Sequence, residues 1–592
     1  MLINVIVPRL WWNSLIYEWN YDFIPENGSR VLVPLGKSDC IGFVYNSENQ
    51  NQEILFEIRS VKKFLDNGKK IIPDDLWDLA IWLGKTYLCG TGLALKMIFP
   101  ENFLNGDEVE FKLCSELCYE ENKRIFSERN FFCPIDSERY EFFVNEFRSN
   151  KKILMLFPLK ETAKKFYSEL PDDLKNDAIL WQTSKKSWDC WKSIYKNDFR
   201  IVIGHQSAVF APFQPEKIFV DDEANPSYIF QRTPQASARS LAGKRALLLN
   251  SEFITCGRMP SLKTFSRSKL NEKKYFEKKY FIDKNFFVIV DSNYSFKESE
   301  KGIEGEMFLT YSLIERSQKE LVNNKNVLWI LDRFGEAGEI FCNKCGESLT
   351  CKKCGGILRT EKNNLRCISC GKVTNMPSEC EHCGSKDTFF SGKRPGLDVL
   401  KKIADKYFQN VALFDGKKLK FKNPCLILGT NALLNFCDNN DIGLIAWLDI
   451  DNELRRPDYN ARFNIFRLLW DSYWRNRKYD RTVLIQARNK GLNFAVALLK
   501  GWQNFLTEEL RLREELFLPP YALIVEIRAK NITQKQEIIN DLEKAGIFVM
   551  DSGEGNIFSI SVKNPEPVRK ILEKFFFISE LKKMPSEKIF AE

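Results

Sequence analysis

The spacing of hydrophobic residues changes its period several times along the 592-residue chain. Near the start, the apolar runs INVIVP, SRVLVPLG and CIGFVYN predict β-strands, and the segment DDLWDLAIWLGKTYL shows the spacing of a helix. From residue 136 to 270, strands such as KKILMLF and FRIVIG alternate with helical segments, and a second alternation follows up to residue 515. This alternation is typical of parallel sheets with crossover helices. The pattern therefore predicts an α/β fold with two parallel-sheet lobes behind a β-rich domain.

Breaks in these patterns divide the chain into domains. Residues 106–135 are charged and poorly patterned, which indicates a linker. After LPPY, the order strand, helix, strand, strand, helix predicts a small α+β domain of the split β-α-β kind. The predicted boundaries are 1–105 for the N-terminal domain, 106–135 for the linker, 136–270 for lobe 1, 271–515 for lobe 2 and 516–592 for the C-terminal domain.

A block of cysteines interrupts the second lobe between residues 340 and 390. Its four C-x-x-C pairs are Cys342/Cys345, Cys351/Cys354, Cys367/Cys370 and Cys380/Cys383. Two thiolates at this spacing bind one ion from a tight turn, and a structural zinc takes four ligands. Eight cysteines therefore predict two closed, structural zinc sites. The spacing alone leaves adjacent, crossed and nested pairings open.

Composition and charge narrow the class of protein further. The other nine of the 17 cysteines are scattered, and the chain starts without a basic leader or cleavage site, so we expect a cytoplasmic protein without disulfides. No run of 18 apolar residues predicts a membrane span. The net charge of +9 favours a polyanionic partner. Basic segments at 266–280 and 415–423 are candidates for phosphate contacts, although such runs are more often solvated surface.

Several motifs resemble those of the PriA family of primosomal replication-restart helicases. They are the runs RIVIGHQSAVFAPF (200–213) and VDDEANPSY (220–228), the eight-cysteine block, RVLVPLGK and LPPY. The resemblance spans nearly the whole chain and implies two helicase-like lobes with a zinc-binding insertion. It also implies nested zinc pairing, a monomer, and a linker that is at most the remnant of a winged helix. The nested sets are Cys342, Cys345, Cys380 and Cys383 for one ion, and Cys351, Cys354, Cys367 and Cys370 for the other.

The resemblance also implies that the N-terminal domain captures the 3′ end of a DNA strand. A terminal base needs an aromatic wall, a polar group near the sugar hydroxyl and a close backbone approach. The residues of this sequence that match the family's pocket are Tyr17, Glu18, Trp19, Gly36 and Arg59. The alternative is that Tyr17 and Trp19 only pack within a strand.

The nucleotide-binding motifs of a helicase are altered in this chain. A phosphate-binding loop needs glycines, and no glycine occurs between Gly106 and Gly204. The family's acidic box is reduced to Asp221, Asp222 and Glu223, and its arginine box keeps one matching residue, Arg475. These four residues are predicted to be remnants of a nucleotide site. We therefore expect no ATP or Mg²⁺ cofactor and predict that the chain is not an enzyme.

Taken together, the motifs predict a DNA-binding replication-restart protein. It is expected to recognise stalled or abandoned forks, and to promote primosome assembly and reloading of the replicative helicase without helicase activity of its own. Its expected partners are branched and single-stranded DNA, other primosome proteins, and the replicative helicase or its loader. Two alternatives stay open: an active ATP-dependent 3′–5′ DNA helicase of the same pathway, and a zinc-ribbon adaptor in transcription or RNA metabolism.

Overall fold

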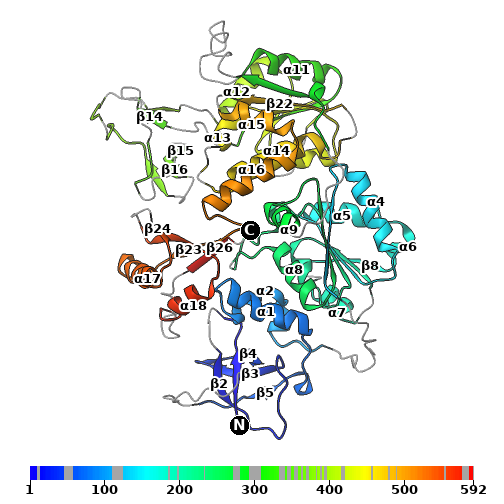
Figure 1. Cartoon of the computed structure of the whole chain (residues 1–592), viewed down its shortest axis with the longest axis vertical. Coiled ribbons are helices and arrows are strands. Elements are labelled where there is room, and N and C mark those ends of the chain that lie inside the picture. Colours follow the sequence, from blue (N-terminus) through cyan, green and yellow to red (C-terminus); the bar gives the residue numbers. More distant parts are fainter. Residues whose placement is uncertain are drawn as a thin grey trace.

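The protein was studied as a computed structural model, whose overall architecture is shown in Figure 1. The description covers all residues except 10–13, 46–57, 110–124, 184–186, 197–198, 233, 271–279, 292–308, 333–339, 343–348, 353–357, 362–363, 368–371, 382, 387–389, 393–395, 415–420, 455, 457, 478–479, 488–489, 552–554, 576–585 and 591–592. Among the residues covered, no helix is long and apolar enough to cross a membrane.

The N-terminal domain is a five-stranded antiparallel sheet followed by three helices (Figure 1). In the spatial order β2-β1-β4-β3-β5, its strands are β1 (Leu2–Ile6), β2 (Leu15–Glu18), β3 (Arg30–Leu35), β4 (Ser38–Tyr45) and β5 (Lys63–Phe64). The helices are α1 (Asp74–Thr86), α2 (Thr91–Ile98) and α3 (Glu101–Leu104). Asp75 of α1 accepts a buried 2.6 Å hydrogen bond from Arg245, in the helix α8 (Ala238–Leu248) of lobe 1, and this contact joins the two domains.

Lobe 1 is a six-stranded parallel sheet in the order β6-β11-β10-β7-β9-β8. Its strands are β6 (Ser127–Phe132), β7 (Ile153–Leu156), β8 (Ala178–Leu180), β9 (Ile201–Gly204), β10 (Lys217–Val220) and β11 (Glu252–Gly257). Its helices are α4 (Asp136–Phe147), α5 (Lys160–Ser168), α6 (Asp172–Lys175), α7 (Ser187–Tyr195), α8 (Ala238–Leu248) and α9 (Leu262–Leu270). Strands β7, β9 and β10 are buried along their whole length, as expected for a sheet covered on both faces.

Lobe 2 is a second six-stranded parallel sheet, in the order β12-β22-β21-β13-β20-β19. Its strands are β12 (Phe287–Asp291), β13 (Asn326–Ile330), β19 (Val411–Leu413), β20 (Leu426–Gly429), β21 (Ile442–Trp447) and β22 (Thr482–Ala487). Its helices are α11 (Tyr311–Val322), α12 (Leu397–Tyr407), α13 (Ile450–Leu454), α14 (Ala461–Trp474), α15 (Lys490–Leu498) and α16 (Trp502–Glu515). The two sheets confirm the predicted pair of parallel lobes.

The cysteine block forms short antiparallel strands that project from lobe 2 (Figure 1). They are β14 (Ile340–Cys342), which pairs with β18 (Phe390–Gly392), and the ladder of β15 (Leu358–Glu361), β16 (Asn364–Cys367) and β17 (Val373–Asn375). Because β14 and β18 pair with each other, the first and last parts of the block lie side by side.

The C-terminal domain is an antiparallel sheet in the order β24-β25-β23-β26, with two helices. Its elements are β23 (Leu523–Arg528), α17 (Ile532–Lys544), β24 (Val549–Met550), β25 (Ile557–Val562), α18 (Glu566–Glu573) and β26 (Ser586–Phe590). The sequence pattern missed β26, which pairs with β23 and completes the split β-α-β arrangement.

One predicted boundary is wrong. The predicted linker at 106–135 contains β6, which pairs in parallel with β11, so the lobe 1 sheet begins at Ser127 rather than at residue 136. The signal was weak because β6 is an edge strand in which no residue is fully buried, and four of the six residues of its sequence SERNFF are polar. The part of the linker at 110–124, where a winged-helix remnant was expected, lies outside the described residues.

Candidate nucleic-acid interface and interlobe site

Three residues of the predicted 3′-end pocket meet at one edge of the N-terminal sheet. The backbone N–H of Glu18 donates to the carbonyl of Arg59 at 3.0 Å. The Arg59 guanidinium donates to the carbonyl of Gly36 at 2.9 Å. Gly36 lies in the β3–β4 turn with a positive φ of 62°, and nothing lies within 4 Å of where a Cβ would be. The edge therefore offers a carboxylate, a guanidinium and an open stretch of backbone.

The Glu18 carboxylate is held in place by two polar neighbours that the sequence did not reveal. It accepts a hydrogen bond from the Ser60 hydroxyl at 2.7 Å and another from the Asn20 amide at 3.2 Å. The Ser60 hydrogen bond, followed by that of Asn20, lowers the pKa of Glu18. The exposed carboxylate is thus kept ionised and oriented, which suits it to accept a hydrogen bond from a sugar hydroxyl.

The two aromatic residues of the predicted pocket face the domain core instead. Tyr17 is 4% exposed, its hydroxyl donates to the carbonyl of Pro34 at 3.0 Å, and burial raises the pKa of Tyr17 to about 12. Trp19 is 2% exposed, and its indole N–H donates to the carbonyl of Phe23 at 2.6 Å. Neighbouring side chains along a strand point to opposite faces, so Glu18 is exposed because Tyr17 and Trp19 are buried.

Tyr17 and Trp19 therefore pack within the domain, as the alternative interpretation expected. Their buried rings are not available to stack on a base. A half-buried ring nearby is that of Tyr21, which lies 4.7 Å from the Trp19 ring centroid. Tyr21 is thus a candidate stacking partner for a terminal base. The sequence motifs did not indicate this residue.

A second group of charged residues lies where the two lobes meet. Asp221 follows β10 and accepts a 2.6 Å hydrogen bond from Arg139, which also donates to Asp136 at 2.6 Å. Burial raises the pKa of Asp221 despite this guanidinium, while Asp221 and Asp136 raise the pKa of Arg139. Asp221, predicted as a remnant of the nucleotide site, is thus paired with an arginine of α4.

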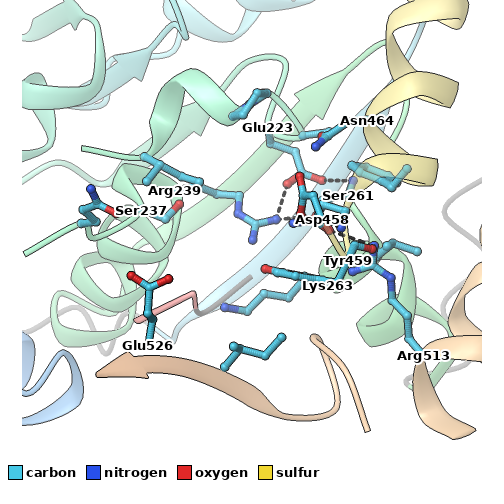
Figure 2. A pocket seen from close by; sticks show the side chains of 18 of the residues that line it. Glu223, Ser237, Arg239, Ser261, Lys263, Asp458, Tyr459, Asn464, Arg513 and Glu526 are labelled. Atoms are coloured by element: carbon cyan, nitrogen blue, oxygen red, sulfur yellow. Dashed lines mark hydrogen bonds and ion pairs between the residues drawn. The ribbon is translucent and has the colours of Figure 1, made fainter. Parts of the chain in front are cut away.

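The other two acidic remnants are also paired. Glu223 accepts from Arg239 at 2.7 Å and from the backbone N–H of Ser261 at 2.6 Å; Figure 2 shows these three residues converging. Asp222 has a positive φ of 49°, and its carboxylate accepts from Asn225 at 2.8 Å.

Asp136, the first residue of α4, is the centre of the interlobe group. Its carboxylate contacts Arg258 at 2.9 Å and accepts from the backbone N–H of Asn476, in lobe 2, at 2.7 Å. Burial alone would raise the pKa of Asp136, but Arg258, Arg139 and this N–H together hold it well below the usual range. The carboxylate also benefits from its place at a helix N-terminus.

The remaining predicted residue, Arg475, lies one residue before Asn476 and makes a two-hydrogen-bond ion pair with Asp438, at 2.8 and 2.5 Å. The structure therefore brings all four predicted remnants to the lobe interface. It adds Asp136, Arg139 and Arg258, which the motifs did not indicate because each acts through partners far away in the sequence. Chemically, the group is a network of mutually neutralised charges that joins the lobes.

The cysteines of the block show turn geometry compatible with metal binding. The backbone N–H of Cys367 donates to the carbonyl of Lys372 at 2.9 Å, and that of Cys380 donates to the carbonyl of Ser385 at 3.1 Å. In both pairs, the first cysteine thus donates its backbone N–H to the residue five positions further on. Cys351 and Cys367 lie in one small buried cluster with Leu358 and Leu365.

Not all of the predicted metal ligands can be placed. Cys345, Cys354 and Cys370 lie outside the described residues, as does the side chain of Cys342. The other four are described: Cys351, Cys367 and Cys380 are buried, whereas Cys383 is exposed.

Known proteins are similar to this chain over most of its length. The family model of the PriA 3′ DNA-binding domain (3′BD) matches residues 4–100. The replication restart protein PriA of Borreliella burgdorferi is 24% identical over 569 residues, covering 87% of this chain and 84% of that protein. The PriA of Thermotoga maritima is 23% identical over 435 residues, covering 69% of this chain and 58% of that protein.

Solved structures give a weaker likeness. Dbp5 of S. cerevisiae bound to RNA and ADP BeF3 has a TM-score of 0.33 and 10% identity, covering 66% of this chain and 89% of that one. A DEAD box protein from Methanococcus jannaschii has a TM-score of 0.25 and 9% identity, covering 72% of this chain and 94% of that one.

The prediction that the chain is not an enzyme is wrong. The relatives that match over most of its length are replication restart proteins PriA, and this indicates a family of DNA helicase enzymes. The absence of glycine between Gly106 and Gly204 does not outweigh this similarity.

Proposed function

The chain belongs to the PriA family of replication restart proteins, and we propose that it recognises stalled or abandoned replication forks by binding the 3′ end of a strand. The observation that carries the proposal is the edge formed by Glu18, Gly36 and Arg59, which lies within the residues matched by the 3′ DNA-binding domain. In this proposal the Glu18 carboxylate accepts the terminal sugar hydroxyl and Arg59 faces the neighbouring phosphate.

Bound to a fork, the protein promotes assembly of the primosome and reloading of the replicative helicase. Its partners are branched and single-stranded DNA, other primosome proteins, and the replicative helicase or its loader. It acts in the cytoplasm as a monomer. The net charge of +9 supports a contribution from sequence-independent phosphate contacts.

The cysteine block holds two structural zinc ions in this proposal. The matching turns that begin at Cys367 and Cys380 support thiolate ligation, and the shared burial of Cys351 and Cys367 supports the inner set of the nested pairing. Zinc would fix the short strands of the block, which bury few apolar residues of their own among those described. The block then presents a docking surface to primosome proteins.

A competition experiment tests the function against its main rival. The full-length protein, bound to a labelled fork with an exposed 3′-hydroxyl end, is challenged with unlabelled fork or with structured RNA of equal length. Fork recognition predicts that the fork competes at least tenfold better than the RNA. Equal or better competition by the RNA would favour an adaptor in RNA metabolism and overturn the proposal.

A second candidate is ATP-driven 3′–5′ unwinding by the two lobes, which membership of a helicase family favours. DNA-stimulated phosphate release measures it, with Asp221→Ala as the control because Asp221 is the acidic residue that follows β10. Turnover above this control supports a motor, and turnover equal to the control removes this candidate.

A further inference from the structure

A basic and aromatic groove lies away from the 3′-end edge, where α1, α8 and α9 meet. Its cavity has a volume of about 360 Å³, within the range of ligand-binding sites. Helix α1 contributes Trp82, α8 contributes Lys244, and α9 contributes Lys263 and Arg267. Phe126, just before β6, lines the same cavity. The groove therefore lies between the N-terminal domain and lobe 1.

The charge of this groove is positive. Four basic residues line it, Arg239, Lys244, Lys263 and Arg267, against one acidic residue, Glu128. The Arg239 guanidinium is neutralised by Glu223, so the formal balance of the other lining charges is +2. Glu128 contacts the exposed Arg267 at 3.9 Å, a long ion pair of the kind that stabilises little at a surface. The Lys244 ammonium lies 5.9 Å from the Trp82 ring centroid, so cation and ring face the same space.

The neighbouring cavity has a different character. It measures about 520 Å³, and Figure 2 shows Arg239 and Lys263 among the residues that line it. Both residues also line the groove. Its three basic residues, Arg239, Lys263 and Arg513, are balanced by Glu223, Asp458 and Glu526. The excess of positive charge thus belongs to the groove and not to the whole junction.

We propose that this groove binds one to two nucleotides of a single-stranded nucleic acid, with a base against Trp82 and phosphates beside Lys244, Lys263 and Arg267. Aromatic rings combined with a positively charged channel are the features that bind single strands without sequence preference. The ring of Trp82 is half-buried, so one side of it is supported by the fold while part of it is open. The T-shaped contact with Tyr87, at 6.1 Å, holds the Trp82 ring in place.

This site rests on the proposed binding of DNA, but it does not involve the strand end. The groove contains no residue of the Glu18–Gly36–Arg59 edge, and its chemistry suits any internal nucleotide. Binding at the groove therefore continues when the 3′ end is blocked, which allows the two sites to be tested separately.

The experiment measures binding of the full-length protein to a fluorescent oligothymidylate that carries a 3′-phosphate. Two variants test the groove, Lys244→Ala/Arg267→Ala and Trp82→Ala. The matched control is Lys402→Ala/Arg511→Ala, which removes the same charges from exposed positions on α12 and α16. A Glu18→Ala variant reports on the 3′-end edge.

The double charge variant is expected to bind about tenfold more weakly than the control. The slope of log affinity against log salt should be shallower by about 1.4, since two phosphate contacts to a single strand are lost. Trp82→Ala should also bind about tenfold more weakly, with an unchanged salt slope. Glu18→Ala should bind like the wild type.

Three results would overturn the inference. The first is equal oligothymidylate affinity of Lys244→Ala/Arg267→Ala and of the control Lys402→Ala/Arg511→Ala. This result is decisive even if Trp82→Ala fails to fold. The second is absence of oligothymidylate binding by the wild type. The third is equally tight binding of polyglutamate, which would make the groove a general polyanion site without base stacking.

Discussion

The carboxylate of Asp136 accepts a 2.7 Å hydrogen bond from the backbone N–H of Asn476, 340 residues away, and so ties the first turn of α4 in lobe 1 to lobe 2. Arg258 contacts the same carboxylate at 2.9 Å, and its backbone carbonyl accepts from the Trp470 indole at 3.1 Å. Asp136 and Arg258 therefore bind the lobes together through a few buried polar contacts.

The first prediction concerns the strength of this joint. Asp136→Ala should lower the free energy of unfolding of the lobes by about 3–5 kcal/mol, because Arg139 and Arg258 lose a buried partner. Urea unfolding of the full-length protein measures the loss. Asp172→Ala, at the exposed start of α6, should cost no more than about 1 kcal/mol. Similar losses for both variants would contradict the role of Asp136 as a joint.

The second prediction concerns pH. The pKa of Asp136 is held below its unfolded value of about 4, so its contribution to stability is complete above about pH 5 and is lost as pH falls below 4. The stability difference between the wild type and Asp136→Asn should therefore be constant from pH 8 to 5 and shrink at lower pH. Asp221, whose pKa is shifted upward, is present in both proteins and cancels in this difference. A difference that grows on acidification would show the opposite sign of shift.

The third prediction concerns metal content. Purified protein should contain two zinc ions per chain, as counted by mass spectrometry of the metal. Cys351→Ser and Cys367→Ser should each lose the same ion, so the double variant loses no more than either single one, whereas Cys380→Ser loses the other ion. If Cys351→Ser and Cys367→Ser together lose both ions, these two residues belong to different sites and the nested pairing is wrong.

The sequence predicted those features that depend on local pattern. Strand β7 is uniformly apolar, and β10 is apolar after Lys217, because both faces of the sheet are covered, so their runs were visible. Strand β6 escaped notice because an edge strand needs fewer apolar residues. The β26 strand was missed although its partner β23 was found, since pairing across 50 residues or more leaves no local signal.

The residues of the candidate sites were likewise predictable where a local motif contained them and unpredictable where only the fold brings them together. Glu18 was found through a short motif, but the burial of Trp19 beside it follows from the direction of alternation in β2, which the motif does not give. Arg139 and Asp136 were not indicated at all. Their partners Asp221 and Asn476 lie 82 and 340 residues further on, and only the fold brings them together.

Recognition of a strand end is the central claim, and a comparison of two forks tests it most directly. The forks differ only in a 3′-hydroxyl or a 3′-phosphate on the leading strand, and equilibrium binding of the full-length wild type is compared with that of Glu18→Ala. The wild type should prefer the hydroxyl about tenfold, because a hydrogen bond to a charged group is lost and a phosphate is repelled. Glu18→Ala should lose this preference, while Glu101→Ala, at an exposed position of α3, should keep it. Equal affinity of the wild type for both forks would contradict the account.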